Sequence, residues 1–302
     1  MKIVENQITS YISANFSESE TAWLLASVFN YGDSIRDGHY LYQYAGQDGT
    51  NSALTPSVDS IGLNPVWVEY APSNYYAMLD GKTSNQTSNL NTIVITVACS
   101  NYDTISLLNI EGVSVDLSLY DNTSASVVYT DSIDLTDTTE IVDFYTYCFN
   151  PFTFLPSIYV DTIPLYNDAE LTITLTATTG SYAKIGRLVF GRSFYVGDTS
   201  YGASLGLESY SSKVADEFGN VSLVHRGSVN LDTYQVYIPT NKVPMLIRKG
   251  QELDAIPILF IMDESSTSNL QNLLNYGYWQ TFNMIIPNPV KSTMSITVKG
   301  IL

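Results

Sequence analysis

Hydrophobic and polar residues alternate with a period of two along much of this 302-residue chain. Because successive side chains of a β-strand point to opposite faces of a sheet, such runs predict half-buried strands. The runs are short and are bounded by Gly, Asn, Asp and Pro, which is typical of β-sandwiches and β-barrels. The clearest predicted strands cover residues 92–98, 113–119, 126–130, 170–177 and 293–298.

Helical periodicity is sparse, and only residues 18–29, 243–253 and 268–274 are candidates for helices. The first candidate has Ser17 and Glu20 at the spacing of a capping box. The Trp within it and the Gly-Asp pair after it are equally consistent with a loop followed by a strand. The pattern as a whole predicts an all-β, multi-domain protein with at most one or two short helices.

The chain is longer than one typical β domain, which suggests two or three structural units. Residues 1–70 are rich in aromatic residues and turns, and we predict a small module there together with an N-terminal arm. Residues 71–192 hold the densest Ser, Thr, Val and Ile alternation, and residues 193–302 end in a long predicted strand. Because no Pro-rich or Gly/Ser-rich linker separates these regions, we expect them to pack against one another. Residues 1–20 either cap a domain of this chain or reach a neighbouring molecule.

Charge narrows the classes of partner. Only 14% of the residues are charged, and 13 Lys and Arg stand against 30 Asp and Glu, a net charge of -17. A protein that binds nucleic acid needs a basic stripe to neutralise phosphates, and an anionic membrane surface repels so acidic a chain. The sequence therefore predicts no nucleic acid and no membrane insertion, and favours neutral, cationic or protein partners.

The N-terminal residues contain no apolar signal-peptide core, and no apolar run approaches the roughly 20 residues that span a bilayer. We therefore expect the chain to be made and kept soluble in the cytoplasm. The two cysteines, Cys99 and Cys148, lie far apart in strand-like runs, whereas a secreted disulfide scaffold has denser cysteines. Both are predicted to be buried free thiols.

Side chains that carry most protein chemistry are few and scattered. His39 and His225 have neither a neighbouring Cys nor a Gly-x-Ser-x-Gly elbow, so no nucleophile has a base beside it in sequence. Residues 131–137 offer three carboxylates but lack the Gly and terminal Glu of an EF-hand loop, and no Cys/His cluster suits zinc. We predict no enzymatic activity, no metal and no cofactor, and expect the function to lie in the surfaces of the protein.

A first resemblance concerns the aromatic region. A Trp is followed by Tyr-Gly-Asp and Gly-His-Tyr, and then by a Gly, a Pro and a closing Trp. This order is similar to that of small chitin- and cellulose-binding modules, in which exposed aromatic rings stack on sugars. The alternative is that the aromatic residues fill a core too small to close otherwise. The resemblance implies four candidate glycan-stacking residues: Tyr40, Tyr42, Tyr44 and Trp67.

A second resemblance covers residues 74–82, 105–120 and 184–191. The Asp-Gly near the start, the turn into the next strand and the closing apolar run look like a galactose-binding-type jelly roll. That resemblance implies a sandwich whose loops at one end are available for ligands.

A third resemblance concerns residues 201–227, where Tyr-Gly-Ala-Ser and Asp-Glu-Phe-Gly-Asn are similar to motifs of tailed-bacteriophage and prophage minor tail proteins. Gly219 and Asn220 are expected to supply the positive φ angles of a hairpin turn. The family resemblance extends over nearly the whole chain and implies a C-terminal domain whose long hairpins pair with neighbours. The candidate assembly residues are Tyr201, Gly202, Asp216, Glu217, Phe218, Gly219 and Asn220.

The resemblance implies a structural component of a phage virion, either a tail or baseplate subunit or a tail-fibre adaptor. It would assemble with other tail proteins, as a homo-oligomeric ring or another multi-copy assembly. The alternative is a glycan-binding adhesin that contacts the host envelope, and a third hypothesis is a polysaccharide depolymerase with facing carboxylates. Exposure of the four aromatic rings separates the first two, because an adhesin needs exposed ring faces.

Overall fold

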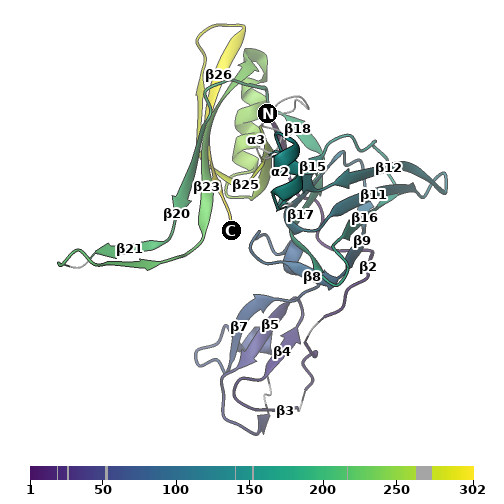
Figure 1. The fold of residues 1–302 in the computed structure, drawn as a ribbon, viewed down its shortest axis with the longest axis vertical. Coiled ribbons are helices and arrows are strands. Elements are labelled where there is room, and N and C mark those ends of the chain that lie inside the picture. Colours follow the sequence, from purple (N-terminus) through teal and green to yellow (C-terminus); the bar gives the residue numbers. More distant parts are fainter. Residues whose placement is uncertain are drawn as a thin grey trace.

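The computed structural model describes residues 1–18, 20–25, 27–51, 54–139, 141–151, 153–215, 217–262 and 274–302. Strands contain 51% of the residues and helices 9%, so the protein is all-β, as the alternating pattern predicts. Figure 1 shows a small module at the bottom, a sandwich at its upper right, and a C-terminal sheet from which a long arm projects.

The central body is a sandwich of two antiparallel sheets. One sheet has the order β15 (Ser157–Val160), β10 (Thr104–Glu111), β17 (Tyr182–Gly191), β8 (Thr87–Leu90). The other has the order β12 (Ser126–Asp134), β11 (Ser114–Asp121), β16 (Ala169–Thr176), β9 (Thr92–Cys99), β2 (Ser13–Ala14). Alternate side chains of β9 and β16 are buried between the sheets, and the 3₁₀ helix η1 (Ala77–Leu79) adds Met78 to the same core.

The C-terminal body is a single antiparallel sheet with helix α3 (Val243–Glu252), preceded by the 3₁₀ helix η2 (Thr240–Lys242), on one face. Its order is β18 (Ser193–Tyr195), β1 (Lys2–Val4), β24 (Ile258–Ile261), β25 (Leu274–Ile285), β26 (Lys291–Gly300), β23 (Ser228–Pro239), β19 (Asp198–Thr199). Strand β20 (Ser204–Ser209) also pairs with β23.

Strand β24 explains how this sheet packs. All four of its side chains are buried, because Ile258 and Phe260 face the core beneath α3 while Leu259 and Ile261 face the sandwich. A strand that is covered on both faces reads as a continuous apolar run rather than an alternating one. The C-terminal sheet is therefore a middle layer between α3 and the sandwich.

The beginning of the chain lies in this C-terminal sheet. Strand β1 pairs with β18 on one side and β24 on the other, and the Met1 amino group donates to Gly197 O at 2.6 Å. Residues 13–14 then join the sandwich as β2 before the chain enters the small module. Of the two alternatives for residues 1–20, the described strands fit the first, because residues 2–4 and 13–14 pair with strands of this chain, in the C-terminal sheet and in the sandwich.

The small module contains a three-stranded sheet of β4 (Ser34–Asp37), β5 (Tyr40–Tyr44) and β7 (Trp67–Pro72). Beside it lie the short pair β3 (Val28–Phe29) and β6 (Thr50–Asn51) and the single-turn helix α1 (Pro56–Asp59). Two further hairpins leave the main bodies. Strands β13 (Thr136–Asp137) and β14 (Thr153–Phe154) form a stem below helix α2 (Phe144–Phe149), and β21 (Ser212–Ala215) pairs with β22 (Val221–Val224) in the arm.

All five predicted strands are confirmed, and the helix predicted at 243–253 is confirmed as α3. A helix over 18–29 is wrong, because this segment pairs with β4: Trp23 N donates to Arg36 O at 2.8 Å and Arg36 N to Thr21 O at 2.9 Å. Of the third candidate, residues 268–273 lie outside the described residues.

Substitution of Leu259 tests whether the sandwich and the C-terminal sheet unfold together. Leu259→Ala should lower the free energy of unfolding by about 2–5 kcal/mol, because Leu259 is fully buried between them. The matched control is Leu207→Ala, because Leu207 is an arm residue that is 74% exposed. This control substitution should change the free energy of unfolding by less than about 0.5 kcal/mol. Denaturant titration followed by circular dichroism measures both, and equal effects would contradict the layered packing.

Candidate functional site

Three of the four candidate glycan-stacking residues form the core of the small module. Tyr42, Tyr44 and Trp67 are buried, and the Trp67 ring centroid lies 4.8 Å from those of both Phe29 and Tyr44. Burial, together with the nearby Glu69 carboxylate, raises the pKa of Tyr42 to about 12. A ring stacks on a sugar only through an exposed face, so the expectation that these three residues bind a glycan is wrong for this fold. Their area instead closes a core that has few other large apolar side chains.

The fourth candidate, Tyr40, lies where the module meets the sandwich. Its half-buried ring makes an edge-to-face contact with the ring of Tyr76, with centroids 5.7 Å apart. The His39 ring stacks on the Tyr76 ring, with centroids 4.3 Å apart. Burial is the main cause that raises the pKa of Tyr40. Tyr40 and His39 therefore help to fix the module on the sandwich.

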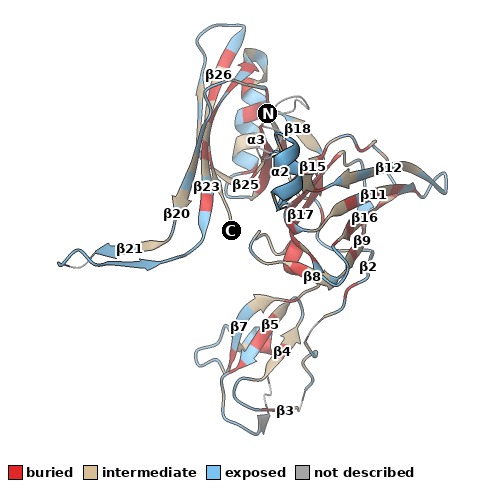
Figure 2. Cartoon of the chain, in the orientation of Figure 1, coloured by how far each residue is buried: buried red, intermediate tan, exposed pale blue. Residues whose placement is uncertain are grey.

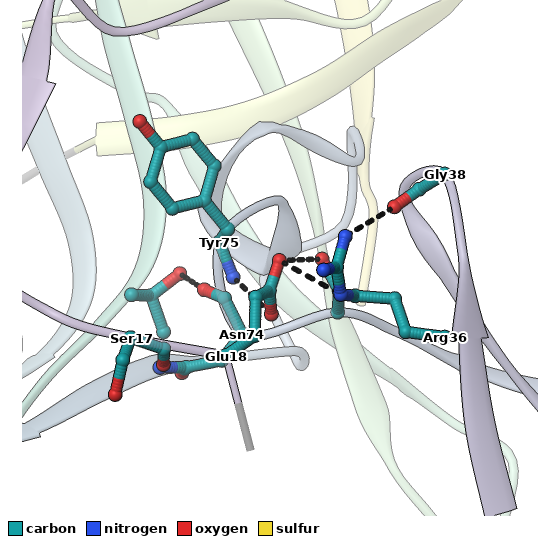
Figure 3. Close-up of polar contacts among 8 residues, drawn as sticks. Ser17, Glu18, Arg36, Gly38, Asn74 and Tyr75 are labelled. Atoms are coloured by element: carbon teal, nitrogen blue, oxygen red, sulfur yellow. Dashed lines mark hydrogen bonds and ion pairs between the residues drawn. The ribbon is translucent and has the colours of Figure 1, made fainter. Parts of the chain in front are cut away.

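The chain enters the small module near Glu18 and leaves it near Ser73, and the Glu18 side chain connects these two segments. Its carboxylate accepts hydrogen bonds from Ser73 Oγ at 2.9 Å and from Tyr75 N at 3.2 Å, and Figure 3 shows Glu18 next to Tyr75 and Arg36. The same carboxylate lies 3.8 Å from Arg36 Nε, and Asn74 Nδ2 donates to the carbonyl oxygen of the residue before Glu18. These contacts hold the module in a defined orientation.

The arm is an extension of strands β20 and β23 beyond the C-terminal sheet, and its outer part, β21–β22, turns away at a corner (Figure 1). Within the described residues, β21 and β22 pair only with each other. Figure 2 shows this outer hairpin exposed. The described part of the arm exposes large aliphatic side chains and a Phe: Leu205, Leu207, Val214, Phe218, Val221, Leu223 and Val224.

The corner of the arm has its own hydrogen bonds. Ser211 Oγ donates to Arg226 O at 3.2 Å and accepts from Arg226 N at 3.0 Å, while Tyr210 N donates to Gly227 O at 3.1 Å. A Cβ on Gly227 would lie 2.4 Å from a methyl carbon of Leu302, so glycine lets the C-terminal residue pack against the corner. The direction of the outer hairpin is therefore specified by particular contacts.

Polar side chains anchor the root of the arm. Buried Asp232 accepts a hydrogen bond from Asn275 Nδ2 at 2.7 Å. Lys299 Nζ lies 2.8 Å from Glu208 and 5.4 Å from the centre of the Tyr210 ring. The hydrogen bond to Glu208 is the main cause that raises the pKa of Lys299 above its usual range. The Lys299 contacts connect β26 to β20 across the intervening strand β23.

The candidate assembly residues form two groups at opposite ends of the arm. Tyr201, which is fully exposed, and Gly202 precede β20, whereas residues 217–220 lie at the tip between β21 and β22. Gly219 has the predicted positive φ, but Asn220 does not, so that part of the turn prediction is wrong. Asp216 lies outside the described residues.

Helix α2 is a surface that the sequence analysis did not single out. None of its residues is buried, and Phe144, Tyr145 and Phe149 are exposed. A capping box between Asp143 and Thr146 fixes its first turn, so the Asp-x-x-Thr spacing in the sequence was the available signal. Cys148 lies on this helix and is exposed, so its predicted burial is wrong, whereas Cys99 is buried as predicted.

The carboxylates of residues 131–137 make local contacts. Asp134 accepts hydrogen bonds from Thr136 and Asp137 from Thr139, and these bonds lower the pKa values of both carboxyl groups. No group of three or more His, Cys, Asp or Glu suited to a metal occurs among the described residues.

No family model, curated protein or solved structure matches this chain. None of the described helices is long and apolar enough to cross a membrane.

Removal of the Trp67 ring should unfold the module selectively. Trp67→Ala should lower the stability of the module by about 3–5 kcal/mol, because a fully buried aromatic side chain leaves a cavity. Limited proteolysis should then cleave within residues 20–72 before the sandwich. Tyr70→Ala is the control, since Tyr70 is half-exposed on the same strand. Equal protease resistance of both variants would contradict the assigned core.

The cap of α2 should weaken in acid. Hydrogen bonds from Thr146, first of all its backbone N–H, hold the pKa of Asp143 below its ordinary value. A carboxyl group with a lowered folded pKa stabilises above its unfolded pKa, about 3.9, and loses this contribution as the pH falls through the folded value. The Thr146 amide resonance should therefore shift below about pH 4. The shift should vanish in Asp143→Asn, and an unchanged titration in that variant would contradict the cap.

Proposed function

We propose that this protein is a structural subunit of a tailed-bacteriophage virion, in the tail or baseplate or as a tail-fibre adaptor, and assembles there in multiple copies. The arm is the observation that carries the proposal. Its outer hairpin pairs only with itself in the described chain and exposes apolar residues such as Val221 and Leu223. A neighbouring molecule that covers this hairpin would bury those residues.

The physical reason lies in the marginal stability of isolated hairpins. Two strands without a packed face are at best marginally stable in water, and exposed apolar strand edges invite aggregation. The corner at Ser211 and the buried Asp232 nonetheless give the arm a specified direction. A specified direction without a partner in the chain fits an element that becomes stable on assembly. Closed rings provide each copy with the same neighbour.

The virion location rests on the motifs of residues 201–227, which resemble those of phage tail proteins. Low charge with abundant Tyr, Asn, Ser and Thr is also suited to extensive protein contacts, because Tyr contributes large area at little entropy cost. The adhesin alternative loses three of its four candidate residues, since Tyr42, Tyr44 and Trp67 are buried. The small module is better suited to hold a fixed position on the sandwich, through Glu18 and Tyr40.

Polar substitutions in the arm should disrupt assembly. Leu207→Ser with Leu223→Ser should weaken self-association by about tenfold or more, because burial of one Leu contributes about 1.5–3 kcal/mol. Ile61→Ser with Leu63→Ser is the matched control, at exposed leucine and isoleucine positions of the module. Size-exclusion chromatography with light scattering measures the association.

Mass spectrometry and cryo-EM of purified phage particles test the location. The chain should be present in many copies, with the arm against a neighbour. A chain that remains monomeric at all concentrations and is absent from the particle would overturn the proposed function.

A further inference from the structure

Helix α2 presents an ordered aromatic surface. Phe144 is 81% and Phe149 71% exposed, and the rings of Tyr145 and Phe149 lie 4.7 Å apart between centroids. An exposed cluster of large apolar side chains is typical of an interaction site rather than of a solvated helix face. The exposed rings are thus a second exposed apolar surface, separate from the arm.

The stem below α2 is anchored in the sandwich. Leu135 is fully buried in the sandwich core, its N–H donates to Val113 O at 2.9 Å, and its carbonyl accepts from Leu155 N at 2.8 Å. The capping box of Asp143 and Thr146 orders the first helical turn. Because the helix is already ordered, binding through it costs little conformational entropy.

The stretch of sequence that contains α2 carries charge of one sign. Residues 83–183 contain twelve Asp and Glu but no Lys, Arg or His. The stem and cap contribute Asp134, Asp137 and Asp143, all with carboxyl pKa values below the ordinary range because of hydrogen bonds from nearby Thr residues. An aromatic surface flanked by carboxylates complements an apolar groove with basic side chains.

The same chain offers such a groove at another place. It has a volume of about 520 Å³ and lies where β1, β18 and α3 meet the loop before β10. This volume is within the range of roughly 300–1,000 Å³ that is common for binding pockets. Its apolar lining includes Tyr102 and Phe194, which are half-buried, above the buried side chains of Ile3, Leu253 and Ile258.

Three of the thirteen basic residues of the chain gather at this groove. Arg192 and Lys249 line it, and Lys242 Nζ lies 5.7 Å from the centre of the ring of Tyr195, which also lines it. Two carboxylates partly neutralise Lys249 Nζ, that of Glu5 in the lining at 3.8 Å and that of Glu252 at 3.4 Å. Exposed Arg192 leaves a basic group available at the rim.

We infer that α2 of one copy docks in this groove of a second copy, with its aromatic rings against the apolar lining and its carboxylates near Arg192. The inference rests on the proposed multi-copy assembly but uses a contact separate from the arm. It names the partner surface: an apolar groove with basic residues on an otherwise acidic chain.

We assign the contact to two molecules because the groove and the base of the α2 stem lie at opposite ends of β10. Tyr102, before the first residue of β10, lines the groove, whereas Ile110 N near its last residue donates to Pro156 O at the base of the stem. Seven strand steps separate these ends by about 20 Å. Two different surfaces in contact form a head-to-tail interface, which closes into a ring when the rotation permits.

Cross-linking between two variants tests this contact. Native Cys148 is the exposed thiol on α2, and Cys99 is buried. Wild-type protein is mixed with a full-length double variant that carries both Cys148→Ser and Gln7→Cys. This variant has its only exposed thiol at the groove. With a short bis-maleimide, a 148–7 product can form only between molecules. The control partner is Cys148→Ser, Leu63→Cys, with its thiol at a fully exposed position of the module.

The 148–7 product should exceed the control product by about tenfold. Addition of Arg192→Glu to the groove partner should reduce the yield of the 148–7 product by about fivefold, since an attractive charge contact becomes repulsive. Lys291→Glu in the same partner, the same charge change at an exposed residue, should leave that yield unchanged. Equal products from both partners, or none at the groove, would overturn the inference.

The arm variant Leu207→Ser, Leu223→Ser separates the two proposals. A groove cross-link that persists while self-association through the arm is lost supports the α2 contact. Association that depends on the arm, with no preference for the groove, leaves the proposed function standing and removes this inference alone.

Discussion

Strand β1 forms backbone hydrogen bonds on both of its edges, with β18 on one side and β24 on the other. Its alternating side chains also join both faces of the C-terminal sheet, since Ile3 packs in the core under α3 and Val4 in the interface with the sandwich. The first residues of the chain thus complete a sheet built from its last third. Without β1, both neighbouring strands would have open edges and the groove beside α3 would lose part of its wall.

The same layered packing accounts for the positions of the two exposed apolar surfaces. The arm leaves the edge of the C-terminal sheet at β23 and β20, and α2 leaves the sandwich on the β13–β14 stem. Each is anchored by buried residues at its root, Asp232 for the arm and Leu135 for the stem. Because each root is already ordered, a partner that buried the apolar outer part would not have to order the chain first. The entropy cost of such binding would therefore be low.

The module shows how one set of residues can serve either a site or a core. Its aromatic residues occur in the order seen in sugar-binding modules, yet three of the four candidates point inward. A strand of alternating residues directs successive side chains to opposite faces, but the sequence does not state which face meets the core. In strand β5 the register places Tyr42 and Tyr44 on the buried face and Gln43 between them in solvent.

The sequence by itself determined the all-β class, the main strands of the sandwich, the helix α3 and the hairpin turn at Gly219. These features depend on local periodicity, capping and backbone freedom, which neighbouring residues specify. Only the tertiary structure decided that Cys148 is exposed, that residues 2–4 belong to the C-terminal sheet and that β1, β18 and α3 line one groove. Those features arise from contacts between residues far apart in the chain, so no local pattern could specify them.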